Sequence, residues 1–571
     1  MFNSLKLEPE MYKYSLYLFS ETLSPKEPPE TWVNLTLMYG LVCAANQCTR
    51  ALRMLAEAKK EDFPLAHKVI THTTYMDDSS GGSNNQEEFD KLVQEMQDLL
   101  PIGGFALKVL TKSGVPPSDK ASADGVSTTF AGYKWLPEED LLMLNSSDLN
   151  FNPKRRGIKK PNEFPVETDE DVDKLLQGKQ LTRRILLGKT LELFDILGLW
   201  EPLKVRLKLD LQPLRMYDYD DIIPEESRDK WVENLKLINQ ARYLQCKRAV
   251  VPSEAVNPDE MELLICSDAA VAMCGCAVYA RYKLKDGLYS CQLLTGRSKT
   301  VQGTFPRNEL EGCSLAAQTG FAVASTFGAR VMDVIFACDN TISICWIANK
   351  DAKLKQFVHT RVKLIHRLVG ADRFYHIAGV ENPSDLLTRG NVDCSSVDLG
   401  SRWQNGDPWM KLRFEEMPLK SYEDLCAAGL SEDQLKDINR EAHPTLPATV
   451  KSLDASTVYF GFEHQLLAFP SSDGAICCDA TDRKKECHCE GKTCCRCLFQ
   501  TELPNQVKDG YDQLRNVCRN VRKLERPKPE KKSADLGNKD YVVDFVKFGF
   551  KKAFLQLSCV LVHLETQAES T

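Results

Sequence analysis

The sequence lacks any long apolar segment. Within its 571 residues, no run approaches the roughly 18 consecutive apolar residues that a membrane-spanning helix requires. The first residues, Met1-Phe2-Asn3-Ser4, also lack the charged and then apolar form of a secretory signal. No internal repeat is evident, which excludes a repeat architecture. We therefore expect an intracellular globular protein, cytoplasmic or nuclear, with no membrane partner.

An excess of positive charge is also missing. The sequence has 73 lysines and arginines against 80 acidic residues, which gives a formal net charge of −7. This balance argues against a protein that coats nucleic acid without selectivity. Two local basic stretches, within 183–208 and 515–528, can still contact phosphates.

Two adjacent acids lie in the segment Thr74-Tyr75-Met76-Asp77-Asp78. Two like charges about 4 Å apart repel by roughly 4 kcal/mol at an effective dielectric of about 20. Acids held together therefore usually bind a cation or have a displaced pKa. A solvated turn is the alternative, because Asp-Asp-Ser-Ser-Gly-Gly is also ordinary loop sequence. Helical patterns over 41–54 and 86–100 flank the pair, and this order fits a palm-like sheet backed by helices.

A different pattern begins near residue 258. Apolar segments predict strands at 261–266, 274–282, 289–298, 331–338 and 373–377, with helices at 309–327, 341–350 and 354–369. Three antiparallel strands followed by a helix, a strand, helices and a last strand form an α/β domain of about 130 residues. Upstream, the pattern predicts strands at 104–112 and 129–136 and a mostly helical stretch at 168–245.

Four acids fall at the edges of the elements predicted after residue 258. They are Asp268 just past the first strand, Glu309 at the start of the first helix, Asp339 at the end of the fourth strand, and Asp385 at the start of a last helix. Sites in α/β sheets collect at the carboxyl ends of strands. Carboxylates gathered there can hold two divalent ions about 3.5 to 4 Å apart, which clamp the attacking and leaving oxygens of an in-line phosphodiester displacement.

Each of these acids also has a purely structural alternative. Asp339 or Asn340 could cap the helix that follows, and Ser384 or Asp385 could cap the last helix. Glu309 suits a first helical turn, because a carboxylate there interacts favourably with the helix dipole. The four acids together, in this order of strands and helices, favour a metal site.

Four motifs resemble those of a known family. They are Cys266-Ser-Asp268-Ala, Phe305-Pro-Arg-Asn-Glu309-Leu, Ala337-Cys-Asp339-Asn and Glu381-Asn-Pro-Ser-Asp385-Leu-Leu-Thr-Arg-Gly390. They resemble the ribonuclease H domain of BEL/Pao-type retrotransposon Pol polyproteins, and the last motif is the most specific. The segment Trp403 to Trp409 is similar to the one that follows this domain in the family, and residues 181–202 and 220–231 resemble its helical connection.

The resemblance implies a multidomain α+β and α/β protein. Its expected parts are a partial reverse transcriptase palm at 1–145, a helical thumb or connection at 146–255, a ribonuclease H-like mixed-sheet domain at 256–395, a Trp/Gly/Pro segment at 396–420, and a linker with a Cys-rich cluster and an irregular basic tail at 421–571.

In the same family, the segment around Asp77 and Asp78 is similar to the polymerase turn of a reverse transcriptase. The resemblance also implies nucleic-acid contacts by Tyr39, Gly40, Lys108 and Trp135. A palm needs a third carboxylate, and Met1-Phe-Asn-Ser4 resembles the residues that follow that acid. Tyr39 stands where the family usually has Phe, and Ala44-Ala45 replaces its usual Ser-Pro. We therefore expect the polymerase to be incomplete.

The 21 cysteines are mostly scattered singly through apolar segments, which favours reduced thiols over a disulfide scaffold. The exception is a cluster near the C-terminus. It contains Cys487, Cys489, Cys494 and Cys497, of which the last two have the spacing of zinc ligands. The cluster is interpreted either as a Zn²⁺ site or as a reduced linker.

An aspartic peptidase is not supported, because no Asp-Thr/Ser-Gly triplet occurs.

The resulting functional hypothesis is a Pol-derived protein of reverse transcriptase lineage. Its expected surviving activity is Mg²⁺-dependent hydrolysis of the RNA strand of RNA–DNA hybrids, with a two-ion site held by Asp268, Glu309, Asp339 and Asp385. Recognition would depend on backbone and 2′-hydroxyl contacts. The alternative is a host-adopted protein that binds nucleic acid or another partner without catalysis. The sequence does not predict the oligomeric state.

Overall fold

The structure is a computed structural model. It describes residues 4–21, 28–38, 40–75, 78–83, 86–107, 109–119, 122, 124–152, 154–155, 158–349 and 354–442. The irregular linker and tail were expected from residue 421, but residues 421–442 contain two helices, Tyr422–Ala428 and Glu432–Arg440, whose starts Ser421 and Ser431 cap. The rest of the expected tail, with its Cys-rich cluster, lies outside the described residues from 443 onward. Among the described residues, none of the helices combines the length and apolar character needed to cross a bilayer.

The N-terminal part is built from three helices and two short hairpins. Its elements are η2 (Pro9–Tyr14), β1 (Leu16–Phe19), β2 (Glu30–Val33), α1 (Ala44–Ala58), α2 (Pro64–His72), β3 (Thr74–Tyr75), β4 (Asp78–Ser79) and α3 (Gln86–Ile102). In α1, the buried residues Cys48, Leu52 and Ala56 recur every four positions, so one face of the helix enters the core. The helices expected at 41–54 and 86–100 are therefore present.

One strand expected in this part does not form. Residues 104–112 contain no strand at their described positions. Gly104 adopts a left-handed φ of +71° just after α3, and the backbone N–H of Phe105 donates to the carbonyl of Leu100. The chain therefore folds back onto α3, and the side chain of Phe105 joins the core of the three helices.

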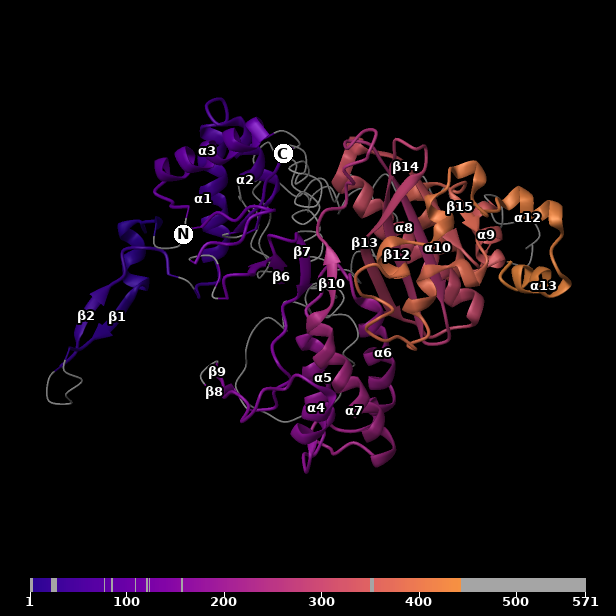
Figure 1. Ribbon diagram of the computed structural model, residues 1–571, viewed down its shortest axis with the longest axis horizontal. Coiled ribbons are helices and arrows are strands. Elements are labelled where there is room, and N and C mark those ends of the chain that lie inside the picture. The colour runs from indigo at the N-terminus through magenta and orange to yellow at the C-terminus, as the bar shows by residue number, and fades with distance from the viewer. Residues whose placement is uncertain are drawn as a thin grey trace, which may run out of the picture. The chain divides into compact units, whose positions relative to one another are not determined.

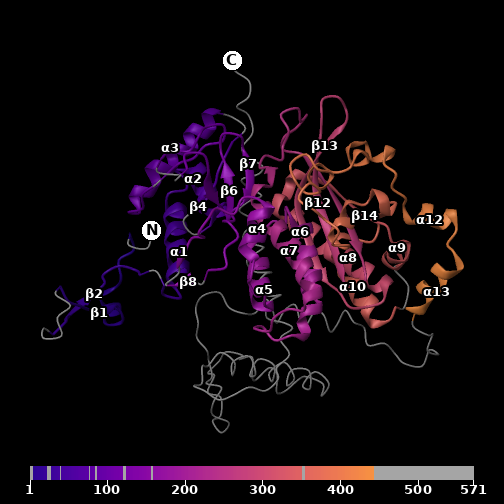
Figure 2. The same cartoon turned by 60° about the horizontal axis from the view of Figure 1, so that its bottom comes forward.

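The next part combines a four-stranded antiparallel sheet with four helices, which Figure 2 shows in purple to magenta. The sheet order is β10-β7-β6-β5, from β5 (Thr128–Phe130), β6 (Tyr133–Leu136), β7 (Leu141–Leu144) and β10 (Gln245–Lys247). The other elements are β8 (Lys154–Arg155), β9 (Ile158–Lys159), α4 (Asp169–Leu176), α5 (Arg183–Glu192), α6 (Glu201–Leu211), η3 (Pro213–Met216), α7 (Glu225–Gln240) and η4 (Ala241–Tyr243). Thr168 and Thr182 fix the starts of α4 and α5 by accepting backbone hydrogen bonds.

A five-stranded mixed sheet follows (Figure 1). Its strand order is β13-β12-β11-β14-β15. Its strands are β11 (Met261–Ala269), β12 (Met273–Lys283), β13 (Tyr289–Thr300), β14 (Val331–Cys338) and β15 (Phe374–His376). The pairs β11–β12 and β12–β13 are antiparallel, whereas β11–β14 and β14–β15 are parallel. Strand β12 is buried at ten of its eleven positions, so its apolar run reflects cover on both faces.

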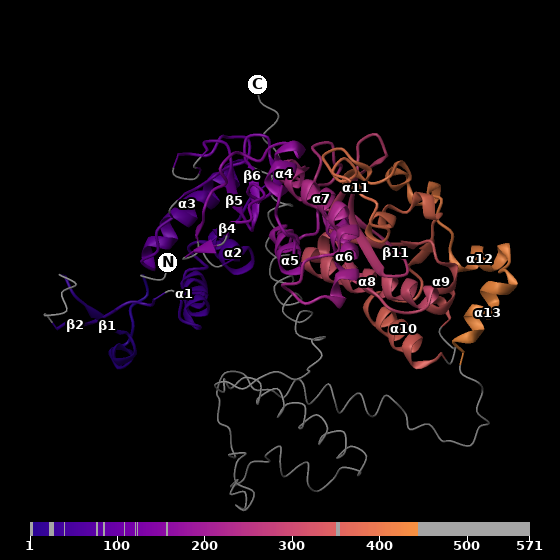
Figure 3. The same cartoon turned by 90° about the horizontal axis from the view of Figure 1, so that it is seen from below.

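Helices and short turns complete this sheet. They are α8 (Phe305–Phe327), η5 (Gly328–Arg330), α9 (Thr341–Ala348), α10 (Gln356–Val369), η6 (Gly379–Glu381), η7 (Pro383–Leu387), α11 (Arg402–Asn405), η8 (Pro408–Lys411), η9 (Phe414–Glu416), α12 (Tyr422–Ala428) and α13 (Glu432–Arg440). Helix α8 packs on β11 and β12, and α10 packs on α8 (Figure 3). The expected multidomain architecture of helices and mixed sheets is confirmed.

The helical connection and the mixed sheet share one continuous hydrophobic core, which runs from Tyr133 to Leu425. Trp403 joins them, because its indole N–H donates to the carbonyl of Leu199 before α6 and its ring lies against Gly296 in β13. A Cβ on Gly198 would stand 1.9 Å from the carbonyl oxygen of Gly296, so this crossing requires glycine. The two parts therefore support each other's folding.

Candidate active site

Two of the predicted acids lie at the ends of neighbouring parallel strands. In the register of β11 and β14, Ser267 pairs with Cys338, so the next residue of each strand is an aspartate, Asp268 or Asp339. Parallel strands bring their carboxyl ends to the same edge of a sheet. The side chains of both acids therefore start from adjacent positions on the same edge.

The third acid, Glu309, comes from helix α8. This helix begins at Phe305, four residues before its predicted start, because Pro306 suits the first helical turn. Glu309 consequently lies in the second turn, one turn before Gly312. A Cβ on Gly312 would lie 3.1 Å from the carbonyl oxygen of Asp268, so the absence of a side chain lets α8 approach the end of β11 closely.

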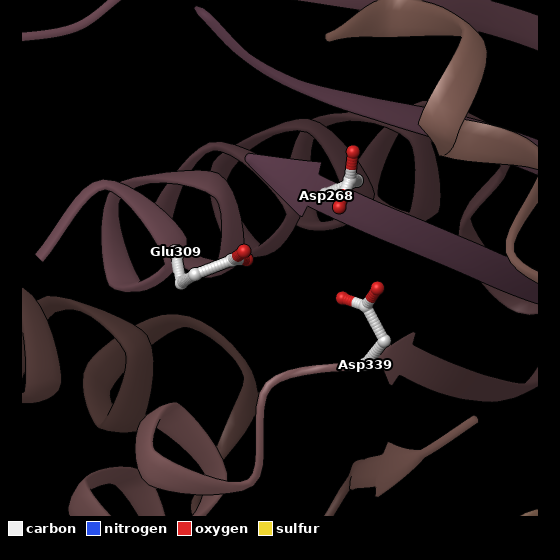
Figure 4. A group of neighbouring side chains, drawn as sticks. All are labelled: Asp268, Glu309 and Asp339. Carbon is white, nitrogen blue, oxygen red and sulfur yellow. The ribbon is translucent and has the colours of Figure 1, made fainter. Parts of the chain in front are cut away.

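Asp268, Glu309 and Asp339 form a compact group. One ligand oxygen from each lies within 4.8 Å of the others, and Figure 4 shows their carboxylates turned toward a common space. Asp268 and Glu309 are only 4% and 3% exposed, and Asp339 is partly buried. Asp385 is not part of this group. It lies in the 3₁₀ turn η7 rather than at the start of an α-helix.

The pKa values of these carboxyl groups are raised in the folded chain. Burial and then the neighbouring carboxylates raise the pKa of Glu309 to about 10. Burial, opposed by a hydrogen bond from Thr388, raises the pKa of Asp268 to about 7. The pKa of Asp339 and that of Asp385 are also raised, in both cases mainly by burial. A divalent cation would relieve both the burial of charge and the mutual repulsion.

Neither Asp339 nor Asp385 caps a helix in the structure, whereas Asn340, the other candidate cap of α9, does. Asn340 caps α9 by accepting from the backbone N–H of Ser343, and Asn382 caps η7 by accepting from that of Ser384. Asp339 Oδ1 is buried and finds no hydrogen-bond partner among the described residues. A buried carboxylate oxygen without a donor is costly, and this oxygen fits a metal ligand.

Asp385 lies beside a cavity of about 190 Å³ that Arg389 and Arg402 also line. Its Oδ1 is 2.6 Å from Nε of Arg389. Arg402 pairs with Asp407 and donates to the carbonyl of Val380. The cavity therefore places two guanidinium groups next to the fourth acid.

Of the residues predicted to belong to the polymerase, those that the structure describes lie in the N-terminal part and in the four-stranded sheet. Asp78 is exposed in β4 of the short hairpin β3–β4, and Gly40 has a left-handed φ of +94°. Trp135 is 8% exposed and its indole N–H donates to Asp140, with Arg248 over the ring. This burial argues against the predicted contact of Trp135 with nucleic acid. Tyr39, Asp77, Lys108, Cys487, Cys489, Cys494 and Cys497 lie outside the described residues.

Three basic side chains of the stretch at 183–208, which the sequence suggested as phosphate contacts, bind other parts of the protein. Lys204 and Lys208 both pair with Glu201, whose pKa is lowered to about 2 because these two cations outweigh its burial. Arg206 donates to Asn234 and to the carbonyl of Val392. These side chains connect α6 to its neighbours rather than forming a free basic surface.

Two residues near the acids received no role from the sequence. Thr388 donates a hydrogen bond to Asp268, and Asn382 donates to the carbonyl of Ser267. Both belong to the motif that also supplies Asp385. Their position next to an acid was visible in the sequence, but their contacts depend on how η7 packs against β11.

The strand order and the acids at the strand ends define a ribonuclease H-like domain. Residues 182–340 match the family model described as Pao retrotransposon-like RNaseH-like domain. Residues 182–340 therefore show the similarity to Pao-type retrotransposon sequences that the motifs predicted. The matched span contains Asp268, Glu309 and Asp339, and it also contains α5 to α7 of the connection.

Solved structures show more distant similarity. The chain is similar to the foamy viral protease-reverse transcriptase in complex with an RNA/DNA hybrid, at 14% identity and a TM-score of 0.35 over 66% of this chain and 42% of that chain. The foamy viral protease-reverse transcriptase dRH in complex with double-stranded DNA has 13% identity and a TM-score of 0.35, over 65% of this chain and 54% of that chain. The chain thus spans about half the length of that viral protein. RNase H1 from the halophilic archaeon Halobacterium salinarum gives 15% identity and a TM-score of 0.16 over 22% of this chain and 93% of that chain. No curated protein matches.

The raised pKa of Glu309 predicts a pH-dependent stability in the absence of metal. The unfolded chain releases this proton near pH 4.3, whereas the folded chain keeps it up to about pH 10. The stabilisation that Glu309 contributes is therefore fully present below about pH 4.3 and is lost as the pH rises toward 10. Glu309→Gln should raise the melting temperature at pH 8 in EDTA and have little effect at pH 4.5.

Glu311, two residues along α8, provides a control of opposite sign. Although burial raises its pKa, hydrogen bonds from Lys299 and Arg361 lower it below the ordinary value overall. Its charge thus stabilises the fold above the unfolded pKa, and Glu311→Gln should lower the melting temperature at pH 8. Equal melting temperatures for Glu309→Gln and the unchanged chain at pH 8 would contradict the account of the buried acids.

Proposed function

We propose that Asp268, Glu309, Asp339 and Asp385 hold Mg²⁺ and that the chain hydrolyses the RNA strand of RNA–DNA hybrids. The observation that carries this proposal is the convergence of three carboxylates, two buried and one partly buried, with ligand oxygens within 4.8 Å of one another. A pair of divalent ions at such a site activates water and stabilises the departing oxyanion of a phosphodiester. The family of the matched domain supports the ribonuclease H reaction class.

The four acids differ in burial, and we expect their roles to differ accordingly. Asp268 and Glu309 are almost completely enclosed, so once a bound cation replaced their protons they would provide negative charge in surroundings of low dielectric, where it acts strongly. Asp339 contributes a buried oxygen that no protein donor occupies among the described residues. Asp385, at the side of the cavity, is the acid best placed to meet the nucleic acid as it arrives.

The cavity beside Asp385 predicts contacts with the phosphate backbone. A guanidinium has five N–H donors, and the contacts described above occupy one donor of Arg389 and two of Arg402. Phosphate contacts make binding salt-dependent, and the slope of log K against log salt decreases by about one for each phosphate-binding side chain that is removed. Arg389→Ala and Arg402→Ala should each weaken binding of an RNA–DNA hybrid and reduce this slope when measured in EDTA, where no hydrolysis occurs.

Arg373 offers a matched control for these two variants. It is also a partly exposed arginine paired with an aspartate, Asp333, but it precedes β15 at the opposite end of the sheet from the acids. Arg373→Ala should leave both the affinity and the salt slope unchanged. Unchanged slopes in both cavity variants would show that the cavity takes no phosphate.

The test of the proposed function uses the full chain and a hybrid whose RNA strand is end-labelled. With Mg²⁺, the RNA strand should be cut, the DNA strand should remain intact, and EDTA should stop the reaction. The ion pair between Asp385 and Arg389 favours the alternative, a protein that binds nucleic acid without catalysis, since it holds Asp385 outside the acid group. Tight hybrid binding with no cleavage at any Mg²⁺ concentration would support that alternative and reject hydrolysis.

A further inference from the structure

The turn η7, which carries Asp385, is attached to the end of β11 by side chains that are not acidic. Asn382 is 1% exposed, and its Nδ2 donates to the carbonyl of Ser267 at 2.9 Å. Leu387, at the other end of η7, lies over Gly275 of β12, where an added Cβ would come within 2.4 Å of its side chain. The position of η7 is therefore set by direct contact with the two strands at the acid edge.

Thr388 makes the contact nearest to the proposed chemistry. It is 3% exposed, and its hydroxyl donates to Oδ2 of Asp268, with the carbonyl of Asp385 as a second acceptor 3.0 Å away. A hydroxyl has a single proton to donate, and an ionised carboxylate is the stronger acceptor. The hydrogen bond to Asp268 is thus favoured whenever that acid is charged.

This hydrogen bond has two consequences for Asp268. It fixes one oxygen of a carboxylate that otherwise could rotate about its last torsion, which is soft in aspartate. It also favours the ionised form, in opposition to burial. Metal ligands commonly depend on such neighbouring donors, and loss of one typically costs 10- to 100-fold in metal affinity or activity.

We propose that Thr388 is a positioning residue, which orients the carboxylate of Asp268 toward the divalent-ion site and links it to the turn that carries Asp385. The proposal rests on the proposed function, because it assumes that the acid group binds Mg²⁺. It explains why the motif around Asp385 contains a buried threonine three residues after the acid. Asn382 has a supporting part, since it holds the backbone of β11 at the residue before Asp268.

The test compares Thr388→Val, which keeps the shape and removes the hydroxyl, with Thr388→Ser, which keeps the hydroxyl. The first readout is the Mg²⁺ concentration at half-maximal rise in melting temperature, which needs no activity. Thr388→Val should raise this concentration by roughly 10- to 100-fold. In cleavage assays, kcat should fall while KM for the hybrid stays unchanged, and Thr388→Ser should restore both readouts most of the way.

Thr360→Val is the matched control. Thr360 is exposed on α10, and its hydroxyl donates back to the carbonyl of Gln356 in its own helix. It should behave as the unchanged chain does. If Thr388→Val does not fold, Thr388→Ala replaces it in the same comparison with Thr388→Ser.

The outcomes separate this proposal from the proposed function. A Mg²⁺ midpoint and kcat of Thr388→Val equal to those of the unchanged chain would overturn the role of Thr388, as would a Thr388→Ser variant as impaired as Thr388→Val. If the unchanged chain binds Mg²⁺ but cuts no hybrid, hydrolysis is rejected, and the shift in Mg²⁺ midpoint still decides the role of Thr388. If the unchanged chain binds no Mg²⁺, both proposals fail.

Discussion

Asp339→Asn is expected to abolish hydrolysis of the RNA strand while the chain still folds and still binds the hybrid. Asparagine has nearly the same size, so the packing around the end of β14 should survive. It removes the charge of an acid whose buried Oδ1 has no protein partner among the described residues. Loss of a neighbouring donor to a metal ligand costs about 10- to 100-fold, and loss of a ligand itself should exceed that. Single-turnover cleavage should therefore slow by more than about 100-fold.

Asp333→Asn is the matched control on the same strand. Asp333 lies near the start of β14, pairs with Arg373 at the surface and is far along the strand from the acid edge. Cleavage by this variant should equal that of the unchanged chain.

In EDTA, Asp339→Asn should melt at a higher temperature than the unchanged chain at pH 8, because the substitution removes repulsion between Asp339 and the other carboxylates of the group. Retention of more than a tenth of the activity in Asp339→Asn would contradict the site.

The second large effect is expected from Trp403→Ala. Trp403 is completely buried, and it bridges the connection and the mixed sheet through Leu199 and Gly296. Its backbone carbonyl also accepts from the hydroxyl of Tyr279 in β12. Removal of a buried tryptophan side chain typically costs about 3–5 kcal/mol. Thermal unfolding followed by circular dichroism should show a large fall in the melting temperature of this part of the chain.

Trp32→Ala provides the comparison for that experiment. Trp32 lies in β2 and is 44% exposed, and among the described residues its ring contacts Phe19 and Tyr17 and its indole N–H donates to Glu30 of the same hairpin. Its removal should leave the transition of the shared core nearly unchanged. A Trp403→Ala variant that melts at the same temperature as Trp32→Ala would show that the connection and the mixed sheet do not depend on this contact.

The sequence predicts the mixed sheet well because its strands are apolar along most of their length. A strand that is buried on both faces, such as β12, is apolar at consecutive positions in the sequence. An acid at the end of such an apolar run, as at Asp268, indicates where the strand reaches the edge of the sheet. Asp339 follows β14 in the same way. Thus the positions of these two acids follow from local pattern alone.

Other features depended on contacts between distant segments and were not predictable from local pattern. Trp135 lies in a strand as expected, but its burial results from Arg248 and Asp140, and Arg248 is more than a hundred positions away. Thr388 and Asp385 are placed by the packing of η7 on β11 and β12, which no periodicity records. The strand expected at 104–112 failed because a left-handed glycine turned the chain back onto α3.

The acids at the edge of β11 and β14 are expected to form a divalent metal centre. Anomalous diffraction from crystals of the full chain grown with Mn²⁺ tests it directly, because Mn²⁺ takes the same oxygen ligands as Mg²⁺ and scatters anomalously. We predict Mn²⁺ peaks among the carboxylates of Asp268, Glu309 and Asp339, with Asp385 drawn toward them. The absence of any peak at these carboxylates at saturating Mn²⁺ would contradict the account.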